Sequence, residues 1–199
     1  MPSIKYYQQG ADHMSHTKIA LGNALKKLTH EKPFDRISVS DITSKCNLNR
    51  QTFYYHFQDK YECLEWTYLH DCLEPLAHGI GVDNWEKRIE KMLMIMSNDK
   101  EFYMRTIHAT PKSFIDPCFT IFKNLFLHAI HVIDENGCVN DQEEEFISEF
   151  LAQGCVGCII SWVDKGMKMT PVDLSSKLKK IEADMEQLNK QKRKMRMQK

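Results

Sequence analysis

Apolar residues recur at intervals of three and four along most of this 199-residue chain. That spacing places them on one face of an α-helix, whereas the alternation of two that is typical of strands is missing. The pattern therefore predicts an all-α fold. The nine helices that it predicts cover approximately residues 17–32, 39–46, 49–56, 59–69, 85–96, 100–109, 114–136, 141–166 and 170–188.

Short-range signals fix where the early helices begin. Ser38 stands three residues before Asp41, and Asp59 three residues before Glu62. In this arrangement side-chain oxygens accept hydrogen bonds from the free N–H groups of a helix start. Asn49 is expected to cap the third helix in the same way.

Later helix ends have signals of their own. Asn136-Gly137 is a natural helix end, and the next helix is expected to begin at Asp141 with a cap from Glu144. Pro117 is expected to mark a first turn. Thr170 begins the run Thr-Pro-Val-Asp, which opens the last helix with proline where its missing N–H costs nothing.

Charge is distributed unevenly, although the net charge is zero. Residues 1–60 contain 9 basic and 5 acidic side chains, residues 61–174 contain 9 and 19, and residues 175–199 contain 9 and 3. A basic end joined to an acidic body is typical of a DNA-binding unit attached to a sensing or assembly domain, although ordinary solvated faces would also produce it.

These patterns divide the chain into four parts. Residues 1–16 are expected to be a flexible arm, and residues 17–62 a helix-turn-helix DNA-binding domain. Residues 63–178 are expected to form a helical ligand-binding and dimerisation domain. Residues 179–199 form a basic helical tail, which either contacts DNA or a partner helix or is a frayed solvated end.

The second and third helices have the lengths and the short connection of a helix-turn-helix, with Asn47 at the turn. The exposed face of the third helix is dense in groups that bond DNA: arginine pairs with guanine, glutamine with adenine, and tyrosine hydroxyls with phosphates. A structural corner of two helices with a polar face is the alternative. The predicted DNA contacts are Ser38, Ser40, Asn49, Arg50, Gln51, Thr52, Tyr54, Tyr55, His56 and Lys60.

The stretch ISVSDITSKCNLNRQTFYYHFQDKYECL, residues 37–64, resembles the DNA-binding signature of the tetracycline-repressor (TetR) family. Two residues depart from that signature: Thr43 stands where alanine is usual, and Asn47 replaces a glycine. The resemblance implies a transcriptional regulator that contacts double-stranded DNA through residues 49–51 and 54–56 and through Lys60. The matching positions are Ser38, Ile42, Asn47, Tyr54, Phe57 and Lys60.

The stretch FISEFLAQGCVGCIISWVDKGMKMTPVDLSSKL, residues 146–178, resembles the ending of TetR proteins related to dihydroxyacetone-kinase operon regulators. This resemblance implies a dimer that represses or activates. The effector that it implies is a small molecule, a metal ion or a partner protein.

Large apolar residues and glycines alternate on the predicted helix over residues 141–166. They predict a homodimer held by a four-helix interface, with a buried helix inside one chain as the alternative. A dimer would place its recognition helices about 34–36 Å apart, or somewhat more, on a pseudo-palindromic operator. The predicted interface residues are Phe146, Phe150, Gly154, Gly157 and Ile159.

Aromatic residues between the fourth and seventh helices either form core or line an effector cavity. The predicted pocket residues are Trp66, Tyr103, Arg105, His108, Phe122 and Phe126.

Nine histidines and seven cysteines are a rich supply of metal ligands. A structural zinc site normally takes four of them, and Cys155 with Cys158 is the one CxxC pair. Buried thiols are therefore the preferred interpretation, and no metal site or certain cofactor is predicted. A zinc-responsive regulator of the same fold and a DNA-silent adaptor or coactivator stay as alternatives.

Enzymatic and membrane functions find little support. The sequence has no glycine-rich phosphate loop, nucleophile elbow or HExxH motif, so no enzyme is predicted. No run of about 18 apolar residues is evident, so no membrane span is expected. Irregularly spaced cysteines without a signal peptide predict a cytoplasmic protein with reduced thiols.

Overall fold

The computed structural model describes residues 16–134 and 139–181, and over these ranges it contains helices and turns without a strand, which confirms the all-α prediction. A 3₁₀ turn, η2 (Phe34–Arg36), precedes α3, a π-helical segment, η3 (Leu69–Leu73), joins α5 to α6, and residues 171–181 form a final helix. The α-helices are α2 (His16–Glu31), α3 (Val39–Lys45), α4 (Arg50–His56), α5 (Lys60–Tyr68), α6 (Glu74–Ala77), α7 (Trp85–Asn98), α8 (Lys100–Thr106), α9 (Pro111–Ile133) and α10 (Asp141–Asp164).

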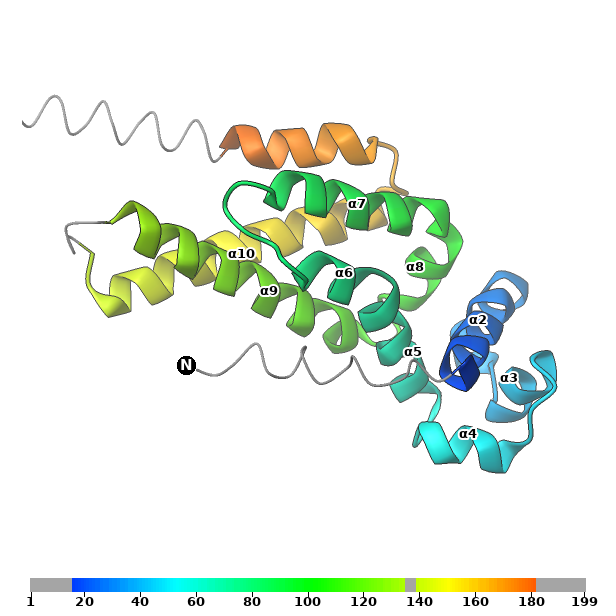
Figure 1. Ribbon diagram of the computed structural model, residues 1–199. Coiled ribbons are helices and arrows are strands. Elements are labelled where there is room, and N and C mark those ends of the chain that lie inside the picture. Colours follow the sequence, from blue (N-terminus) through cyan, green and yellow to red (C-terminus); the bar gives the residue numbers. More distant parts are fainter. Residues whose placement is uncertain (1–15, 135–138, 182–199) are drawn as a thin grey trace, which may run out of the picture.

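The molecule is elongated, with α2, α3 and α4 at one end and the last residues of α9 and the first residues of α10 at the other (Figure 1). α9 and α10 lie side by side as an antiparallel pair. α5 packs against both α2 and α9 and so connects the two ends. The predicted division between residues 62 and 63 therefore falls inside a helix that both parts share.

The predicted fourth helix continues farther than expected, through η3 to Ala77. Its π-helical segment lies directly before Pro75, which has no N–H to donate to the carbonyl of Asp71. A proline interrupts the regular bonding of a helix, and a widened turn is one way in which the chain accommodates it.

The interior of the C-terminal part is aromatic. Tyr68, Phe102, Tyr103 and Phe114 are buried. The ring centroid of Tyr68 lies 5.5 Å from that of Phe114 and 5.9 Å from that of Tyr103. Such ring pairs stabilise a core beyond the area that they bury. This section of the aromatic stripe is packed core.

Two helix starts differ from the predictions. α9 begins at Pro111, so Pro117 lies inside the helix rather than in its first turn. α10 is capped by Asn140, whose side chain accepts from the N–H of Glu143, whereas the cap was predicted from Glu144. The predicted helix end at Asn136-Gly137 lies outside the described residues.

The final helix begins as predicted. Thr170 Oγ1 accepts a hydrogen bond from the N–H of Asp173 (3.1 Å). The helix then buries Leu174 and Leu178, and Lys179 forms an ion pair of 2.7 Å with Glu86 of α7. Most of the predicted basic tail lies outside the described residues.

α10 is the described helix that comes nearest to a membrane span, although no run of about 18 apolar residues is evident in its sequence. By length and composition alone it passes as a spanning helix: its most apolar stretch has a mean hydropathy of 1.5, and 33% of that stretch is buried. Core helices of soluble proteins pass the same criteria. Glu149, Gln153 and Ser161 interrupt the apolar side chains, which is why no continuous apolar run was evident in the sequence.

Gly22 marks a close approach between α2 and α5. A Cβ atom at this position would lie 2.9 Å from Thr67 Oγ1 and 3.3 Å from the indole of Trp66. The Thr67 hydroxyl is buried and donates to the carbonyl of Cys63 (2.7 Å). Moving it away would therefore break a buried hydrogen bond.

Gly22→Ala is expected to lower the free energy of unfolding by about 1–3 kcal/mol, because over-packing outweighs the helix propensity that alanine gains. Urea unfolding measures the change. The neighbouring exposed residue provides the control: Asn23→Ala is expected to be unchanged or slightly more stable. Equal losses in the two variants would contradict the tight contact.

Candidate nucleic-acid interface

Side-chain caps define the starts of α3 and α4. Ser38 Oγ accepts from the N–H of Asp41 (3.1 Å), and Asp41 Oδ2 accepts from the N–H of Ser38 (2.7 Å), which completes a capping box. Asn49 Oδ1 accepts from the N–H of Thr52 (2.7 Å). The predicted caps of both helices are confirmed.

The turn between α3 and α4 follows from Asn47. Its φ angle is 56°, in the left-handed region that asparagine tolerates better than most residues. The N–H of Leu48 then donates back to the carbonyl of Thr43 (2.9 Å). Thr43 is buried, and its hydroxyl donates to the carbonyls of Val39 and Ser40, so it fits inside the helix pair without an unsatisfied group.

Apolar residues anchor the recognition helix α4 from beneath. Phe53 and Ile42 are fully buried, and Phe57 is 2% exposed. The ring centroids of Phe53 and Phe57 lie 5.7 Å apart, and Phe57 packs in turn against Trp66 of α5. Because these anchors face inward, Arg50, Gln51, Tyr54 and Tyr55 of α4 face solvent, whereas Thr52 and His56 are half-buried.

The outer face of α4 presents arginine and tyrosine side chains. Tyr54 is 50% exposed and Tyr55 is 85% exposed. The Arg50 guanidinium donates to the Tyr54 hydroxyl (3.3 Å) and lies 5.9 Å from the centroid of its ring. Gln51 is also exposed. These four groups form a polar surface with both charged and aromatic character.

The other predicted contact residues are partly engaged within the chain. The Thr52 hydroxyl donates to Asn49 Oδ1 (3.0 Å), and the Ser38 hydroxyl donates to Asp41. Ser40 is exposed. Partial burial and the nearby Lys18 ammonium lower the pKa of His56 from its ordinary 6.5, which favours the neutral imidazole.

Lys60 occupies an unexpected place. Its ammonium donates to the carbonyls of Phe34 (3.0 Å), Asp35 (2.9 Å) and Ile37 (3.0 Å), and burial lowers its pKa. An ammonium has three N–H donors, and all three are occupied. In the free chain Lys60 therefore holds α5 against the chain before α3, and the predicted phosphate contact would require it to release one of these carbonyls.

Lys18 is a cation that the sequence did not single out. Its Nζ lies 5.5 Å from the ring centroid of Phe57 and 5.9 Å from that of Trp66. It thus stands beside the C-terminal end of α4, close enough to His56 to affect its pKa. The contact joins residues far apart in the sequence, so periodicity gave no sign of it.

The predicted effector-pocket residues do not surround one cavity. Phe122 is fully packed, and Phe126 stacks on it. Trp66 stacks on His70, Arg105 donates to the carbonyl of Thr29 (2.7 Å), and His108 pairs with Asp164 at the surface (2.6 Å). Of the six, only Tyr103 lines the larger cleft described below.

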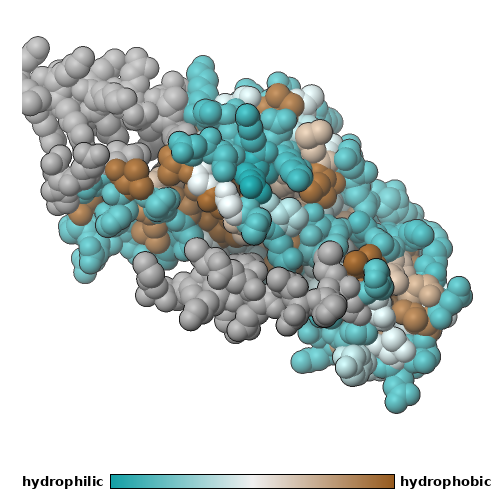
Figure 2. Space-filling view, viewed as in Figure 1, coloured by the Kyte–Doolittle hydropathy of each residue, from teal (hydrophilic) through white to brown (hydrophobic). Residues whose placement is uncertain are grey.

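The predicted dimer residues mostly share one open face of α10. Phe146 is 70% exposed and Phe150 67%, and a Cβ atom at Gly154 or Gly157 would meet nothing within 4 Å. Ile159 is fully buried in the core, which corrects its predicted place in an interface. Figure 2 shows apolar side chains at the surface of the α9–α10 end.

Potential metal ligands stay apart in the described part of the chain. No group of three His, Cys, Asp or Glu residues there has the arrangement that could hold a metal ion. Cys155 of the CxxC pair is partly buried, and Cys158 is exposed on the open face of α10.

Two family models match the sequence. One, described as bacterial regulatory proteins of the tetR family, matches residues 23–66, which include the helix-turn-helix. The other, a TetR C-terminal model described as a transcriptional regulator C-terminal region, matches residues 83–183 and so half of the chain.

Relatives agree with these matches. The transcriptional activator DhaS of the dhaKLM operon in Lactococcus lactis is 30% identical over 89 residues, which is 45% of this chain and 48% of that protein. The HTH-type regulator YxbF of Bacillus subtilis is 24% identical over 172 residues, covering 78% of this chain and 41% of that protein. The matches thus span less than half of either relative.

A solved structure has the same fold. The dihydroxyacetone kinase operon activator DhaS superposes with a TM-score of 0.66 at 24% identity, covering 83% of this chain and 93% of that one. At this identity the likeness establishes the fold alone.

Asp41 gives the helix-turn-helix a pH dependence. The Lys32 ammonium, 2.8 Å away, and the capping bonds of Ser38 hold the pKa of this carboxyl well below its ordinary 3.8. A carboxylate with a lowered pKa stabilises the fold fully above its ordinary value, and this contribution is lost as the pH falls. Asp41→Asn is expected to lower the free energy of unfolding by about 1 kcal/mol at pH 7.

Urea unfolding of Asp41→Asn and wild type at pH 7, 5 and 3 measures this dependence. The difference between them is expected to be largest at pH 7 and to shrink at pH 3, where the wild type begins to lose the contribution. A difference that is constant over this range would show that the charge of Asp41 is irrelevant.

Proposed function

The chain belongs to the TetR family of bacterial regulatory proteins, and we propose that it regulates transcription by binding a pseudo-palindromic operator as a homodimer under the control of an effector. Its DNA-binding domain would be residues 17–62, and its dimerisation and effector domain residues 63–178. It would act in the cytoplasm, where the operator lies.

The single observation that supports DNA binding best is the outward face of α4. Arg50, Gln51, Tyr54 and Tyr55 are exposed on a helix whose other side is anchored in the core. Arginine and glutamine near the start of a recognition helix are suited to base edges in the major groove, and tyrosines farther along to phosphates. Asn49 still has its amide N–H groups to donate, because its cap uses only the oxygen.

Lys18 would make the phosphate contact that the sequence predicted for Lys60. Its ammonium lies at the end of α4, and the aromatic rings below it limit its freedom. A lysine so placed would bind a phosphate without reading a base. Lys60 would support the domain from within.

Gel shifts with the DNA upstream of the chain's own gene test these roles. Wild type is expected to bind with an affinity that falls steeply with salt. Arg50→Ala is expected to cost about 1–3 kcal/mol and to relax preference at one base position. Lys18→Ala is expected to weaken binding to all DNA sequences alike and to reduce the slope of log K against log salt concentration by about 1.

Lys91→Ala is the matched control, because Lys91 is an exposed lysine on α7, away from α4. It is expected to leave DNA affinity unchanged. Purified wild type that shows no salt-sensitive binding, with or without candidate effectors, would refute the regulator and leave a DNA-silent adaptor of this fold.

The open face of α10 supports the homodimer. Phe146 and Phe150 are large apolar groups in solvent, and one and two turns farther along Gly154 and Gly157 leave space for another backbone. Exposed apolar surface of this kind is stabilised by burial against a partner, and glycines allow helices to approach closely. A second copy of α10 would meet both needs.

Gly157→Arg and Phe150→Glu are each expected to convert the dimer to a folded monomer. Each places a charge in the proposed interface, and each side chain points into open space in the single chain. Light scattering after gel filtration measures the mass, and circular dichroism checks the fold.

Met94→Glu controls for the loss of any exposed apolar residue, because Met94 is 48% exposed on α7. This variant is expected to stay dimeric. A wild type that is monomeric at micromolar concentration, or variants that all remain dimeric, would contradict the proposed interface.

A further inference from the structure

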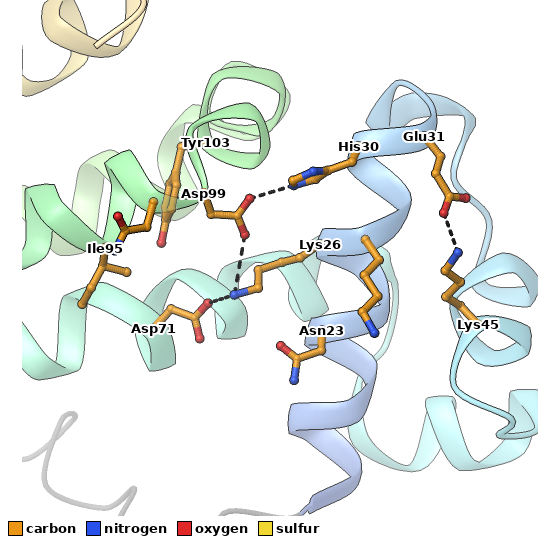
Figure 3. A pocket seen from close by; sticks show the side chains of 11 residues that line it. Asn23, Lys26, His30, Glu31, Lys45, Asp71, Ile95, Asp99 and Tyr103 are labelled. Carbon is orange, nitrogen blue, oxygen red and sulfur yellow. Dashed lines mark hydrogen bonds and ion pairs between the residues drawn. The ribbon is translucent and has the colours of Figure 1, made fainter. Parts of the chain in front are cut away.

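A cleft lined mostly by polar residues separates α2 from the corner where η3, α7 and α8 meet (Figure 3). Its volume is about 650 Å³, which is the size of a site for a small organic molecule. Lysines and a histidine of α2 form one wall, and Asp71 and Asp99 lie on the other. The two walls thus belong to the DNA-binding helices and to the C-terminal part.

The carboxylates in this cleft already have nitrogen partners. Lys26 Nζ lies 2.7 Å from Asp71 and 3.8 Å from Asp99, and His30 Nε2 lies 2.7 Å from Asp99. Glu31, the third carboxylate of the lining, pairs with Lys45 at 2.5 Å. A positively charged ligand would therefore have to displace an existing partner.

Two donors of the cleft, on Lys27 and Tyr103, have no partner that meets full hydrogen-bond geometry among the described residues. Lys27 is exposed and forms no ion pair with any residue that the structure describes. Tyr103 is 1% exposed, and its hydroxyl lies near the Cys72 thiol without a hydrogen bond of full geometry. Figure 3 shows its ring extending from α8 toward Ile95 and Asp71.

The chemistry of Tyr103 makes it a donor. Burial raises the pKa of this phenol well above its ordinary 10.0, so the hydroxyl keeps its proton. A thiol is only a weak acceptor, so this buried hydroxyl is incompletely satisfied, and a stronger acceptor placed beside it would lower that cost.

We propose that this cleft binds a small organic oxyanion, a carboxylate or phosphate compound whose oxygens accept from Lys27 and from the Tyr103 hydroxyl. The site differs from the aromatic interior in which the sequence predicted an effector. As a control of DNA binding it rests on the proposed function, whereas the binding itself does not.

A ligand at this place would act on the orientation of the DNA-binding helices. α2 contacts α3 and α5 on one side and α8 on the other, and Arg105 of α8 already donates to the carbonyl of Thr29. A molecule bound to both walls stabilises one relative placement of α2 and the core. DNA affinity then changes by at most the factor by which the ligand binds that placement more tightly than the alternative.

Calorimetric titration of the full chain with citrate and with inorganic phosphate tests the site, with glycerol as the neutral comparison at equal ionic strength. Saturable binding of at least one anion is expected. Tyr103→Phe is expected to weaken it roughly threefold to tenfold through one lost hydrogen bond. Lys27→Ala is expected to weaken it about tenfold through one lost charge-assisted bond.

Two matched controls separate the site from general effects. Tyr68→Phe removes another buried hydroxyl without a partner of full geometry, from a ring that stacks on Tyr103 but does not line the cleft. Lys112→Ala removes an exposed lysine elsewhere. Both are expected to leave anion affinity unchanged, and both tyrosine variants are expected to keep or slightly raise the free energy of unfolding.

The outcomes distinguish this inference from the proposed function. No saturable anion binding, equal binding of glycerol, or equal losses in Tyr103→Phe and Tyr68→Phe would overturn the oxyanion site. Gel shifts of the same preparation without anion test DNA binding separately. A preparation that binds the upstream DNA but no anion refutes the site alone, and one that binds anion but no DNA refutes the regulator alone.

Discussion

The packing of α2 is the constraint on which the other parts depend. Its apolar residues Leu21, Leu25 and Leu28 are buried, and the helix contacts α3, α5 and α8. Its polar side reaches the C-terminal part through Lys26 and His30, and its last turn accepts from Arg105. α2 thus connects α3, on which α4 packs, to the C-terminal part of the chain.

Local features of the DNA-binding end were predictable because they depend on residues four or fewer positions apart. The capping box of Ser38 and Asp41, the cap of Asn49 and the left-handed Asn47 all follow from the chemistry of a single turn. The apolar periodicity of a helix likewise shows which side of α4 faces inward. These signals sufficed for the fold and for the outward face of the recognition helix.

Contacts across the chain were beyond such reasoning. Lys60 looked like a phosphate ligand because it follows a recognition helix, yet three carbonyls 23 to 26 residues earlier occupy its donors. Lys26 and Asp71 are 45 residues apart, and Arg105 and Thr29 are 76 apart. The cleft beside the C-terminal half of α2 is lined by residues from α2, α3, η3, α7 and α8, so no periodicity could indicate it.

α10 has an exposed apolar face, and such a face can be buried either in lipid or against another protein surface. Lys123 of α9 forms ion pairs with Glu145 and Glu149 of α10, which are charges a bilayer would have to desolvate. On the open side Gly154 and Gly157 follow the exposed phenylalanines at helical spacing, as close helix packing requires. A glycine offers little apolar surface for lipid to cover, whereas it lets a second helix pack closely along the open face of α10. The same composition that makes α10 resemble a membrane span therefore favours a second copy of the chain as its cover.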